Sequence, residues 1–483
     1  MTSLPPSFPD GFFFGAATAS YQIEGAVAEG GRGPSIWDTR AHTPGLIRDG
    51  DTGDVTDDHF HRFADDVAAM AEMGLTAYRF SMAWPRIQPT GSGPFSDEGF
   101  AFYHRLLDEL EKHGIEPLAT LYHWDLPQPL EDAGGWPNRE TAYAFEAYAR
   151  RTATEFKDRV TRWATLNEPW CSAFLGYSQG SHAPSRTEPV ASLAAAHHLN
   201  LAHGLASRAI REVVPGASVS IVLNTHVPRP WDPSNPADVD ASRRIDALAN
   251  RIFMEPLVSG TYPADLVADT RELTDWSFVL DGDLEAVRGS IDVVGVNYYS
   301  SHVVRHNPAL GLGDGADGHS PAPGTAWPGS EHVEFMRPFG PLTTMGWNQD
   351  ASGFHAYLLR MHRDMGLPII VTENGASFDD VVDPDGRVHD ADRVRYLHDH
   401  FEAALMAIAD GVDIRGYMVW SLMDNFEWSH GFSKRFGLLR VDFGDLSRRW
   451  KDSAYWYRET IRNRRPASVE SAAALGTTPP ATY

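Results

Sequence analysis

The sequence predicts an α/β fold, a single (β/α)8 TIM barrel whose long βα loops form the rim of the active site. Three observations predict it: eight short apolar runs recur along the 483 residues, helical patterns separate them, and no Gly-rich dinucleotide fingerprint follows the first run. Short, nearly continuous apolar runs are typical of parallel strands that are buried on both faces. Eight alternating strand and helix units therefore favour a closed barrel over an open, doubly wound sheet.

The expected strands are runs of apolar and β-branched residues. In chain order they cover residues 12–17, 76–81, 116–122, 161–166, 218–224, 292–298, 368–372 and 415–421. Between them, apolar residues recur with the helical period of about 3.6 residues. The clearest helical patterns cover residues 57–73, 97–113, 139–156 and 392–410. Such helices would return the chain to the start of the next parallel strand.

One catalytic domain is expected over residues 1–463, because α/β barrels often exceed about two hundred residues as a single unit. Long connections follow the fourth and the sixth expected strands, and the second of them holds the Gly/Asp/Pro-rich stretch 307–329. We expect these connections to be rim loops that shape an entrance. Residues 464–483 are Ala/Thr/Pro-rich and lack apolar periodicity, which predicts a disordered C-terminal tail.

Composition limits the classes of partner. A formal net charge of −24 argues against nucleic acid and anionic membranes, because both bind basic surfaces. Cys171 is the only cysteine, which excludes an intrachain disulfide and a cysteine-ligated metal cluster and fits a cytoplasmic location. Residues 1–10 lack the pattern of a signal peptide, and no later segment has the apolar length of a membrane span. A small-molecule partner is expected, and the sequence leaves open whether the chain forms a homo-oligomer.

Polar and aromatic residues gather at the carboxyl ends of the expected strands. In a closed barrel these ends share one face, where barrel enzymes build their active sites. Amides, carboxylates, an imidazole and indoles suit a sugar, because its hydroxyls need hydrogen bonds and its apolar ring face stacks on indole. The residues at or after the strand ends are Gln22, Arg79, His123, Trp124, Asn167, Glu168, Asn224, Asn297, Tyr299, Glu373 and Trp420.

Two of these residues are glutamates in short strings more than two hundred residues apart. Thr-Leu-Asn-Glu-Pro covers residues 165–169, and Val-Thr-Glu-Asn-Gly covers residues 371–375. Two converging carboxylates indicate glycosidic bond cleavage, and in retaining enzymes they lie about 5–5.5 Å apart. At that separation one carboxyl is held protonated while the other stays ionised, and Arg79 on an adjacent strand is placed to keep Glu373 ionised.

Both strings, together with the string from Trp420 to Trp428, closely resemble the signatures of glycoside hydrolase family 1, the β-glucosidase family. The resemblance covers residues 8 to about 462 and implies that Glu168 is the general acid/base and Glu373 the nucleophile. It also implies that Tyr299 hydrogen-bonds the nucleophile. The predicted substrate contacts are Gln22, His123, Asn167, Asn297 and Trp420 for the glycone, Glu427 and Trp428 for its outer hydroxyls, and Trp347 for the leaving group.

The resemblance implies hydrolysis of terminal β-D-glucosyl residues with retention of configuration and without a cofactor. Cellobiose, short oligosaccharides and aryl glucosides are the expected substrates, with β-galactosidase, β-fucosidase and transglycosylation as side activities. Glu168 is not the Gln of thioglucoside-cleaving relatives, and Glu427 stands where phospho-sugar relatives have Ser. The alternative is a sugar-binding relative without turnover, although such proteins typically lack one of the two glutamates. Glycone preference stays open.

The loop after Glu168 is predicted to form an aglycone wall with Trp170, Phe174, Tyr177 and His182, and packing beneath the loop is the alternative for each aromatic. Three other motifs are interpreted as non-functional. The Gly-rich spelling at 313–318 has no preceding strand and no following helix. The histidines at 197, 198 and 203 lack the i, i+4 spacing of metal ligands, and the Asp-Pro-Asp-Gly at 383–386 is a turn. No metal site is therefore expected.

Overall fold

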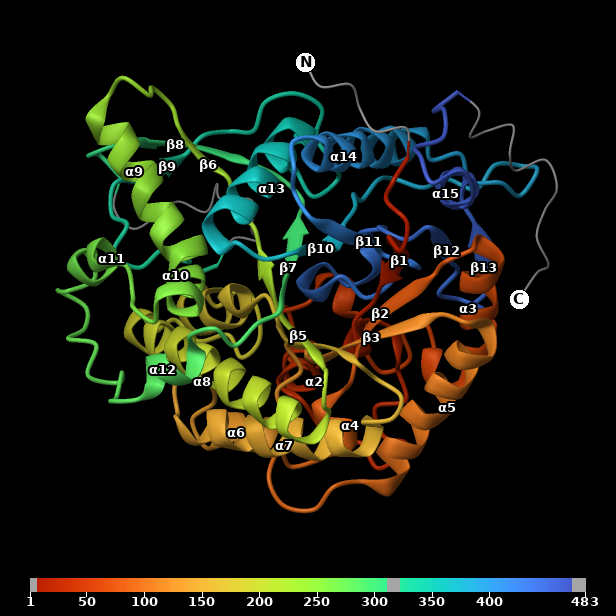
Figure 1. The fold of residues 1–483 in the computed structure, drawn as a ribbon, viewed down its shortest axis with the longest axis horizontal. Helices are drawn as coiled ribbons and strands as arrows, with labels where there is room; N and C mark the ends of the chain where they lie inside the picture. Colours follow the sequence, from red (N-terminus) through yellow and green to blue (C-terminus); the bar gives the residue numbers. More distant parts are fainter. Residues whose placement is uncertain (1–6, 311–321, 471–483) are drawn as a thin grey trace.

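Eight parallel strands close into a barrel in the computed structural model, which describes residues 7–310 and 322–470 (Figure 1). The barrel strands are β1 (Phe13–Ala17), β2 (Ala77–Ser81), β3 (Glu116–Tyr122), β4 (Arg162–Asn167), β5 (Ser218–Asn224), β7 (Val293–Tyr298), β10 (Ile369–Asn374) and β11 (Ile414–Trp420). Each pairs with its neighbours in chain order, and β11 closes the barrel by pairing with β1. The predicted (β/α)8 barrel is confirmed, and every predicted strand is present within two residues of its expected ends.

Helices surround the barrel (Figure 1). The main ones are α3 (His59–Met73), α5 (Asp97–His113), α7 (Glu140–Phe156), α8 (Pro189–Val213), α13 (Ala351–Met365), α14 (Ala391–Ala409) and α15 (Asp452–Asn463). Local sequence explains their ends: Ser96 caps the start of α5 by accepting a hydrogen bond from the Gly99 amide, and Gly114 ends it in the left-handed region. The four predicted helices, at 57–73, 97–113, 139–156 and 392–410, correspond to α3, α5, α7 and α14.

Short helices lie in the connections that follow the strands. After β1 and β2 come α1 (Ser20–Ile23), α2 (Ile36–Ala41), η1 (Arg48–Gly50) and α4 (Trp84–Ile87). After β3, β4 and β11 come α6 (Gln128–Asp132), the π-helix η2 (Cys171–Gln179) and η4 (Trp428–Ser433). Between β5 and β7 the chain forms α9 (Pro236–Asp246), the π-helix η3 (Ala247–Arg251), α10 (Ile252–Ser259), α11 (Ala264–Asp269) and α12 (Asp283–Val287).

The two long connections contain more regular structure than rim loops alone. The connection after β4 holds η2 and α8, and the connection after β7 holds two strands and α13. Those strands belong to a three-stranded sheet formed by β6 (Pro228–Pro230), β8 (His302–His306) and β9 (Val333–Phe335). A hairpin of β12 (Leu439–Val441) and β13 (Arg448–Trp450) precedes α15. Residues 311–321, with the Gly-rich spelling at 313–318, lie outside the described part of the chain.

The two ends of the described chain meet beside β1. The Phe8 amide donates to the Arg464 carbonyl at 2.8 Å, and the Phe8 ring packs edge-on against Phe14 and Phe401. Ala467 is buried, and its carbonyl accepts a hydrogen bond from the Trp456 indole at 2.8 Å. The first residues after 463 therefore pack against α15, and residues 471–483 of the predicted tail lie outside the described residues.

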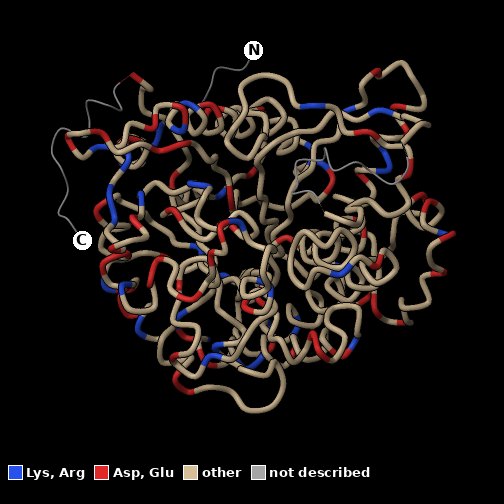
Figure 2. The backbone as a smooth tube through the Cα atoms, turned by 180° about the vertical axis from the view of Figure 1, so that it is seen from behind, with Lys and Arg blue, Asp and Glu red and all other residues tan. Residues whose placement is uncertain are grey.

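Acidic and basic positions lie close together over the outer helices, as red and blue segments in Figure 2 show. Many of them form ion pairs, such as Arg243 with Asp269 and Arg360 with Asp246. Within residues 7–310 and 322–470, no helix combines the length and the apolar character that crossing a bilayer requires.

Candidate active site

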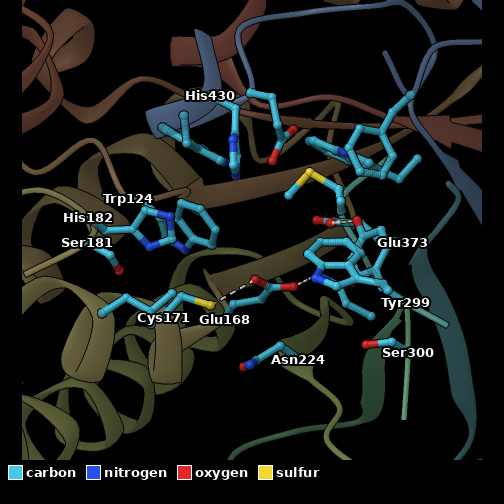
Figure 3. Close-up of a pocket in the computed structure, with 18 of the residues that line it drawn as sticks. Trp124, Glu168, Cys171, Ser181, His182, Asn224, Tyr299, Ser300, Glu373 and His430 are labelled. Atoms are coloured by element: carbon cyan, nitrogen blue, oxygen red, sulfur yellow. Dashed lines mark hydrogen bonds between the residues drawn. The ribbon is translucent and has the colours of Figure 1, made fainter. Parts of the chain in front are cut away.

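One pocket opens at the carboxyl ends of the barrel strands, and both glutamates of the sequence motifs line it (Figure 3). The strands that carry them are irregular at this end: the β4–β5 register shifts between Ala164 and Asn167, and the β10–β7 register shifts between Val371 and Glu373. Such bulges bend a strand and redirect its side chains, and they occur often beside active sites. Both carboxyl groups are buried, with residue exposures of 6% for Glu168 and 3% for Glu373.

Glu168 follows β4 in a left-handed backbone conformation, with φ of 46°. Such values are uncommon outside glycine and cluster at functional sites. Its Oε1 accepts a hydrogen bond from Asn297 Nδ2 at 2.7 Å, and its Oε2 lies 3.2 Å from the Cys171 thiol. Burial, followed by the negative charge of Glu373, raises the pKa of Glu168 to about 8. Glu168 is therefore protonated at neutral pH.

Glu373 is the penultimate residue of β10 and lies one residue beyond the predicted end of the strand. Its Oε1 accepts from the Arg79 guanidinium at 2.5 Å, and its Oε2 accepts from the Tyr299 hydroxyl at 2.6 Å. Gly375 allows the chain to leave β10 here, because a Cβ at that position would lie 1.7 Å from the Trp420 carbonyl oxygen. A buried cation and a phenol thus each donate a hydrogen bond to the Glu373 carboxylate.

Two asparagines connect the glutamates through a continuous set of hydrogen bonds. Asn297 Nδ2, besides bonding Glu168, donates to Asn167 Oδ1 at 3.1 Å. The same Asn167 oxygen accepts from Arg79 at 2.8 Å, and Arg79 holds Glu373. The relative position of the two carboxyl groups is therefore set by side chains from β2, β4, β7 and β10.

This arrangement also determines the tautomer of His123. Asn167 Oδ1 faces two obligate donors, so its Nδ2 must be the atom 2.9 Å from His123 Nε2, which then accepts. Burial and the charge of Arg79 lower the His123 pKa well below its usual range, so the ring is neutral. Its proton is on Nδ1, a buried atom with no hydrogen-bond partner among the described residues. His123 thus offers one N–H at the pocket wall.

Glu427, Trp124 and Trp428 form part of the pocket wall. Burial, and then the charges of Glu373 and Glu168, raise the Glu427 pKa to about 8, and its Oε2 has no hydrogen-bond partner among the described residues. Trp428 packs against Trp37 and Trp124, with ring centroids 4.4 and 4.6 Å away. An unpaired carboxyl oxygen beside indole faces suits a ligand that combines hydroxyls with an apolar face.

Gln22 and Asn167 are hydrogen-bonded to residues in or next to this wall. Both are fully buried, and Gln22 Nε2 donates to Asn425 Oδ1 at 3.0 Å and to the Phe426 carbonyl at 2.9 Å. Gln22 Oε1 has no partner among the described residues. Among the remaining predicted contacts, Asn297, Tyr299, Trp347 and Trp420 line the pocket, and Arg79 is buried beneath it.

The predicted aglycone wall is only partly correct. His182 and Trp347 line the pocket, and the Trp347 ring centroid lies 5.4 Å from that of Tyr299. Trp170, Phe174 and Tyr177 instead are at most 1% exposed and lie outside the pocket lining. The π-helix η2 is buried along its whole length, so these rings pack inward. Packing beneath the loop, the alternative interpretation, is correct for all three.

Several lining residues lack a signal in the sequence motifs. Thr225 and His226 directly follow Asn224, so a strand-end rule extended by two residues finds them. The others come from the connections, where only the fold brings them near the glutamates. They are Leu175, Ser181, Ser300, His302, Met345, Ser429, His430 and Phe436.

The three histidines that lack the spacing of metal ligands each bond to different protein groups. His197 bonds Asp283 and Tyr262, His198 bonds the Trp136 carbonyl, and His203 bonds Thr165 and Ser290. The Asp-Pro-Asp-Gly segment is a turn, because the Gly386 amide donates to the Asp383 carbonyl at 2.8 Å.

A family model described as glycosyl hydrolase family 1 matches residues 4–466. The chain belongs to glycosyl hydrolase family 1. Its members are retaining glycosidases, and this chain is accordingly a glycoside hydrolase with the barrel that the sequence motifs implied.

Relatives of this family 1 hydrolase have similar lengths. The bifunctional β-D-glucosidase/β-D-fucosidase of Bifidobacterium breve is 47% identical over 464 residues, which cover 94% of this chain and 98% of that protein. β-Glucosidase A of Thermotoga maritima is 42% identical over 458 residues, with coverage of 94% and 98%.

Solved structures of family 1 enzymes superpose closely on the hydrolase. The psychrophilic β-glucosidase of Micrococcus antarcticus is 44% identical and has a TM-score of 0.91 over 95% of this chain and 98% of that one. A Thermotoga maritima β-glucosidase in complex with deoxynojirimycin is 41% identical and has a TM-score of 0.88 over 95% and 100%.

Proposed function

We propose that this family 1 hydrolase is a β-glucosidase that acts by double displacement, with Glu373 as nucleophile and Glu168 as general acid and base. One observation carries the assignment of roles: the two carboxyl groups of one pocket have opposite environments. Glu373 accepts hydrogen bonds from the Arg79 guanidinium and the Tyr299 hydroxyl, whereas burial raises the pKa of Glu168 to about 8. A nucleophile must be ionised and a general acid must carry a proton, so only this division of roles suits both residues.

In the first step Glu373 attacks the anomeric carbon, and the bond to the leaving oxygen breaks as Glu168 donates its proton to that oxygen. The result is a glycosyl ester on Glu373 and an ionised Glu168. Removal of one negative charge from Glu373 makes Glu168 a base in the second step. Glu168 then takes a proton from water, which attacks the same carbon and releases the sugar with its original configuration.

The remaining wall residues are proposed to bind the glycone. His123 offers an N–H and Glu427 a carboxyl oxygen that have no partner within residues 7–310 and 322–470, and Trp420 and Trp428 offer indole rings. Gln22 and Asn167 are proposed to bind the glycone as well, while Gln22 also holds the Phe426 carbonyl and Asn167 the ring of His123. Trp347 is proposed to stack on the leaving group.

We propose β-glucosides as substrates, including cellobiose, short cello-oligosaccharides and aryl glucosides. The β-glucosidase names of the relatives support glucose as the glycone, and the bifunctional Bifidobacterium breve protein supports β-fucoside as a second one. A binding protein without turnover is not favoured, because both glutamates are present and each has partners that suit its chemical role. We propose a cytoplasmic location on the single, unpaired cysteine.

Initial rates on p-nitrophenyl β-glucoside, β-galactoside, β-fucoside, α-glucoside and 6-phospho-β-glucoside test the activity. We expect the highest rates on the β-glucoside or β-fucoside. Glu373→Ala should lose turnover by roughly 10⁴-fold or more. Glu116→Gln, at the opposite end of barrel strand β3, is the control and should keep full activity. Preference for the α-glucoside, or unchanged rates in Glu373→Ala, would contradict the proposal.

A further inference from the structure

Cys171 lies against the carboxyl group that the proposed function makes the general acid and base, and the inference rests on that proposal. Its Sγ is 3.2 Å from Glu168 Oε2, and the side chain lines the pocket (Figure 3). The turn after β4 produces this contact, because the Cys171 amide donates to the Glu168 carbonyl at 3.0 Å and folds residue 171 back toward Glu168.

The two oxygens of Glu168 have chemically different neighbours. Oε1 faces Asn297 Nδ2, and an amide N–H can only donate. The orientation of that amide is determined, because its nitrogen lies within hydrogen-bond distance of two oxygens, Glu168 Oε1 and Asn167 Oδ1. A proton on Oε1 would oppose the amide N–H. The acidic proton of neutral Glu168 is therefore on Oε2, the oxygen that the thiol touches.

A thiol suits this place because it can accept and donate. Sulfur is a weak acceptor and S–H a weak donor. Burial, followed by the charge of Glu168, raises the pKa of the Cys171 thiol well above its usual range, so the thiol keeps its proton. We propose that Cys171 is a positioning residue that accepts from Glu168 Oε2–H in the resting enzyme and donates to Oε2 after proton transfer, thereby keeping the transferable proton on Oε2.

The proton balance follows directly. As the glycosidic C–O bond breaks, its electron pair stays on the leaving oxygen, which takes the proton from Oε2. The S–H then turns toward the new carboxylate, and no proton leaves the thiol. In the second step Oε2 takes a proton from the attacking water and the sulfur becomes an acceptor again. Cys171 thus stabilises the ionised form of Glu168 more than the neutral form, because donation to a charged oxygen is the stronger bond.

Other charged groups around Glu168 are the same in every variant compared. Glu168 interacts electrostatically with four of them: Glu373 from β10, Arg79 from β2, Tyr299 after β7 and Glu427 after β11. The pocket also contains five histidines. They are His123, His182, His226, His302 and His430.

The test compares Cys171→Val, which keeps the volume and removes the S–H, with Cys171→Ser, which keeps a donor and acceptor. The measurement is kcat/KM against pH for phenyl β-glucoside, whose poor leaving group needs the acid. The basic limb should move up by roughly half a pH unit in Cys171→Val, because the ionised form of Glu168 loses a donor. In Cys171→Ser it should stay near the wild-type position. On 2,4-dinitrophenyl β-glucoside, which needs little acid help, glycosylation should change less than twofold.

Ser172→Ala is the matched control, because Ser172 is the next residue of the same buried helix and its hydroxyl makes no hydrogen bond to Glu168 in the described part of the chain. A basic limb at the wild-type pH in Cys171→Val would overturn the inference, and so would an equal shift in Ser172→Ala. Glu168→Gln separates this result from the proposed function. If Glu168→Gln hydrolyses phenyl β-glucoside with the wild-type basic limb, the role of Glu168 is wrong, whereas a flattened limb keeps that role whatever Cys171 does.

Discussion

Tyr299 acts on the proposed nucleophile through a single hydrogen bond. Its hydroxyl donates to Glu373 Oε2 at 2.6 Å, while Arg79 holds the other oxygen. A donor at this distance keeps the carboxylate oriented toward the anomeric carbon. The hydrogen bond forms again when the glycosyl ester is hydrolysed. Arg79 thus places a positive charge beside Glu373, and Tyr299 orients the carboxylate.

Replacement of Tyr299 by Phe should therefore lower kcat/KM by about 10- to 100-fold and leave the fold intact. Steady-state kinetics and a thermal unfolding curve measure the two effects. Tyr298→Phe is the control: the neighbouring hydroxyl donates to the Asp350 carbonyl, away from the glutamates, and its loss should cost stability more than catalysis. Equal kinetic losses in the two variants would refute a specific role for Tyr299.

At the residue scale, the sequence predicted what a strand end determines. Glu168, Glu373 and His123 were found because they directly follow, or end, runs of apolar residues. Trp170 looked equivalent, but whether an aromatic faces a ligand or the core depends on the local backbone, and here Trp170 is the buried residue that precedes a π-helix. Spacing of residues in a loop carries no such information, so Met345 and Phe436 were missed.

At the scale of elements, a buried ion-pair network attaches the loop after β11 to α14 and α15. Lys451 is fully buried and bonds Asp424 at 2.6 Å and Asp380 at 2.5 Å. Asp380 also bonds Arg393 of α14 at 2.9 Å, and Asp424 accepts from the Gly437 amide at 3.0 Å. Gly437 follows Phe436, which lines the pocket. The network thereby holds one wall of the active site.

Lys451→Met should lower the free energy of unfolding by about 3–5 kcal/mol, because it leaves two buried carboxylates without their shared cation. It should also raise KM, since the loop that carries Phe436 loses an anchor. Urea unfolding and steady-state kinetics measure both. Lys112→Met, which breaks an exposed pair with Glu109, should change stability by less than about 1 kcal/mol. A comparable loss of unfolding free energy in the two variants would mean that the buried network stabilises the fold no more than an exposed ion pair does.

The barrel strands and four outer helices were predictable because their periodicities are set locally by burial on two faces or on one. The β6–β8–β9 sheet was not, since its strands are three to five residues long and two of them pair only after the chain has passed through β7. The π-helices η2 and η3 have no distinct sequence period either. The elements that the sequence did not predict are thus those that depend on tertiary contacts.

At the scale of the whole molecule, the active site costs stability. The pKa values of Glu168 and Glu427 are both raised from 4.5 to about 8. Between these values the native state binds more protons than the unfolded state, so the free energy of unfolding falls as pH rises through that window. The contribution of these two groups is fully favourable below about pH 4.5 and lost above about pH 8.

Glu168→Gln should therefore unfold at a higher temperature than the wild type at pH 8, with a gain on the order of 2–4 kcal/mol that shrinks toward pH 5. The difference between variant and wild type cancels the titration of unrelated groups. Calorimetry at pH 5, 6.5 and 8 measures it. A gain that is the same at all three values would contradict the raised pKa of Glu168.

The central claim is that Glu373 forms a covalent bond to the sugar while Glu168 moves protons. Incubation with 2,4-dinitrophenyl 2-deoxy-2-fluoro-β-glucoside should trap the glycosyl-enzyme, because the fluorine slows both steps while the good leaving group keeps the first one accessible. Mass spectrometry of the digested protein should then find one fluoroglucosyl group on Glu373. A label on Glu168 or Glu427, or hydrolysis to an inverted product without any label, would contradict the account.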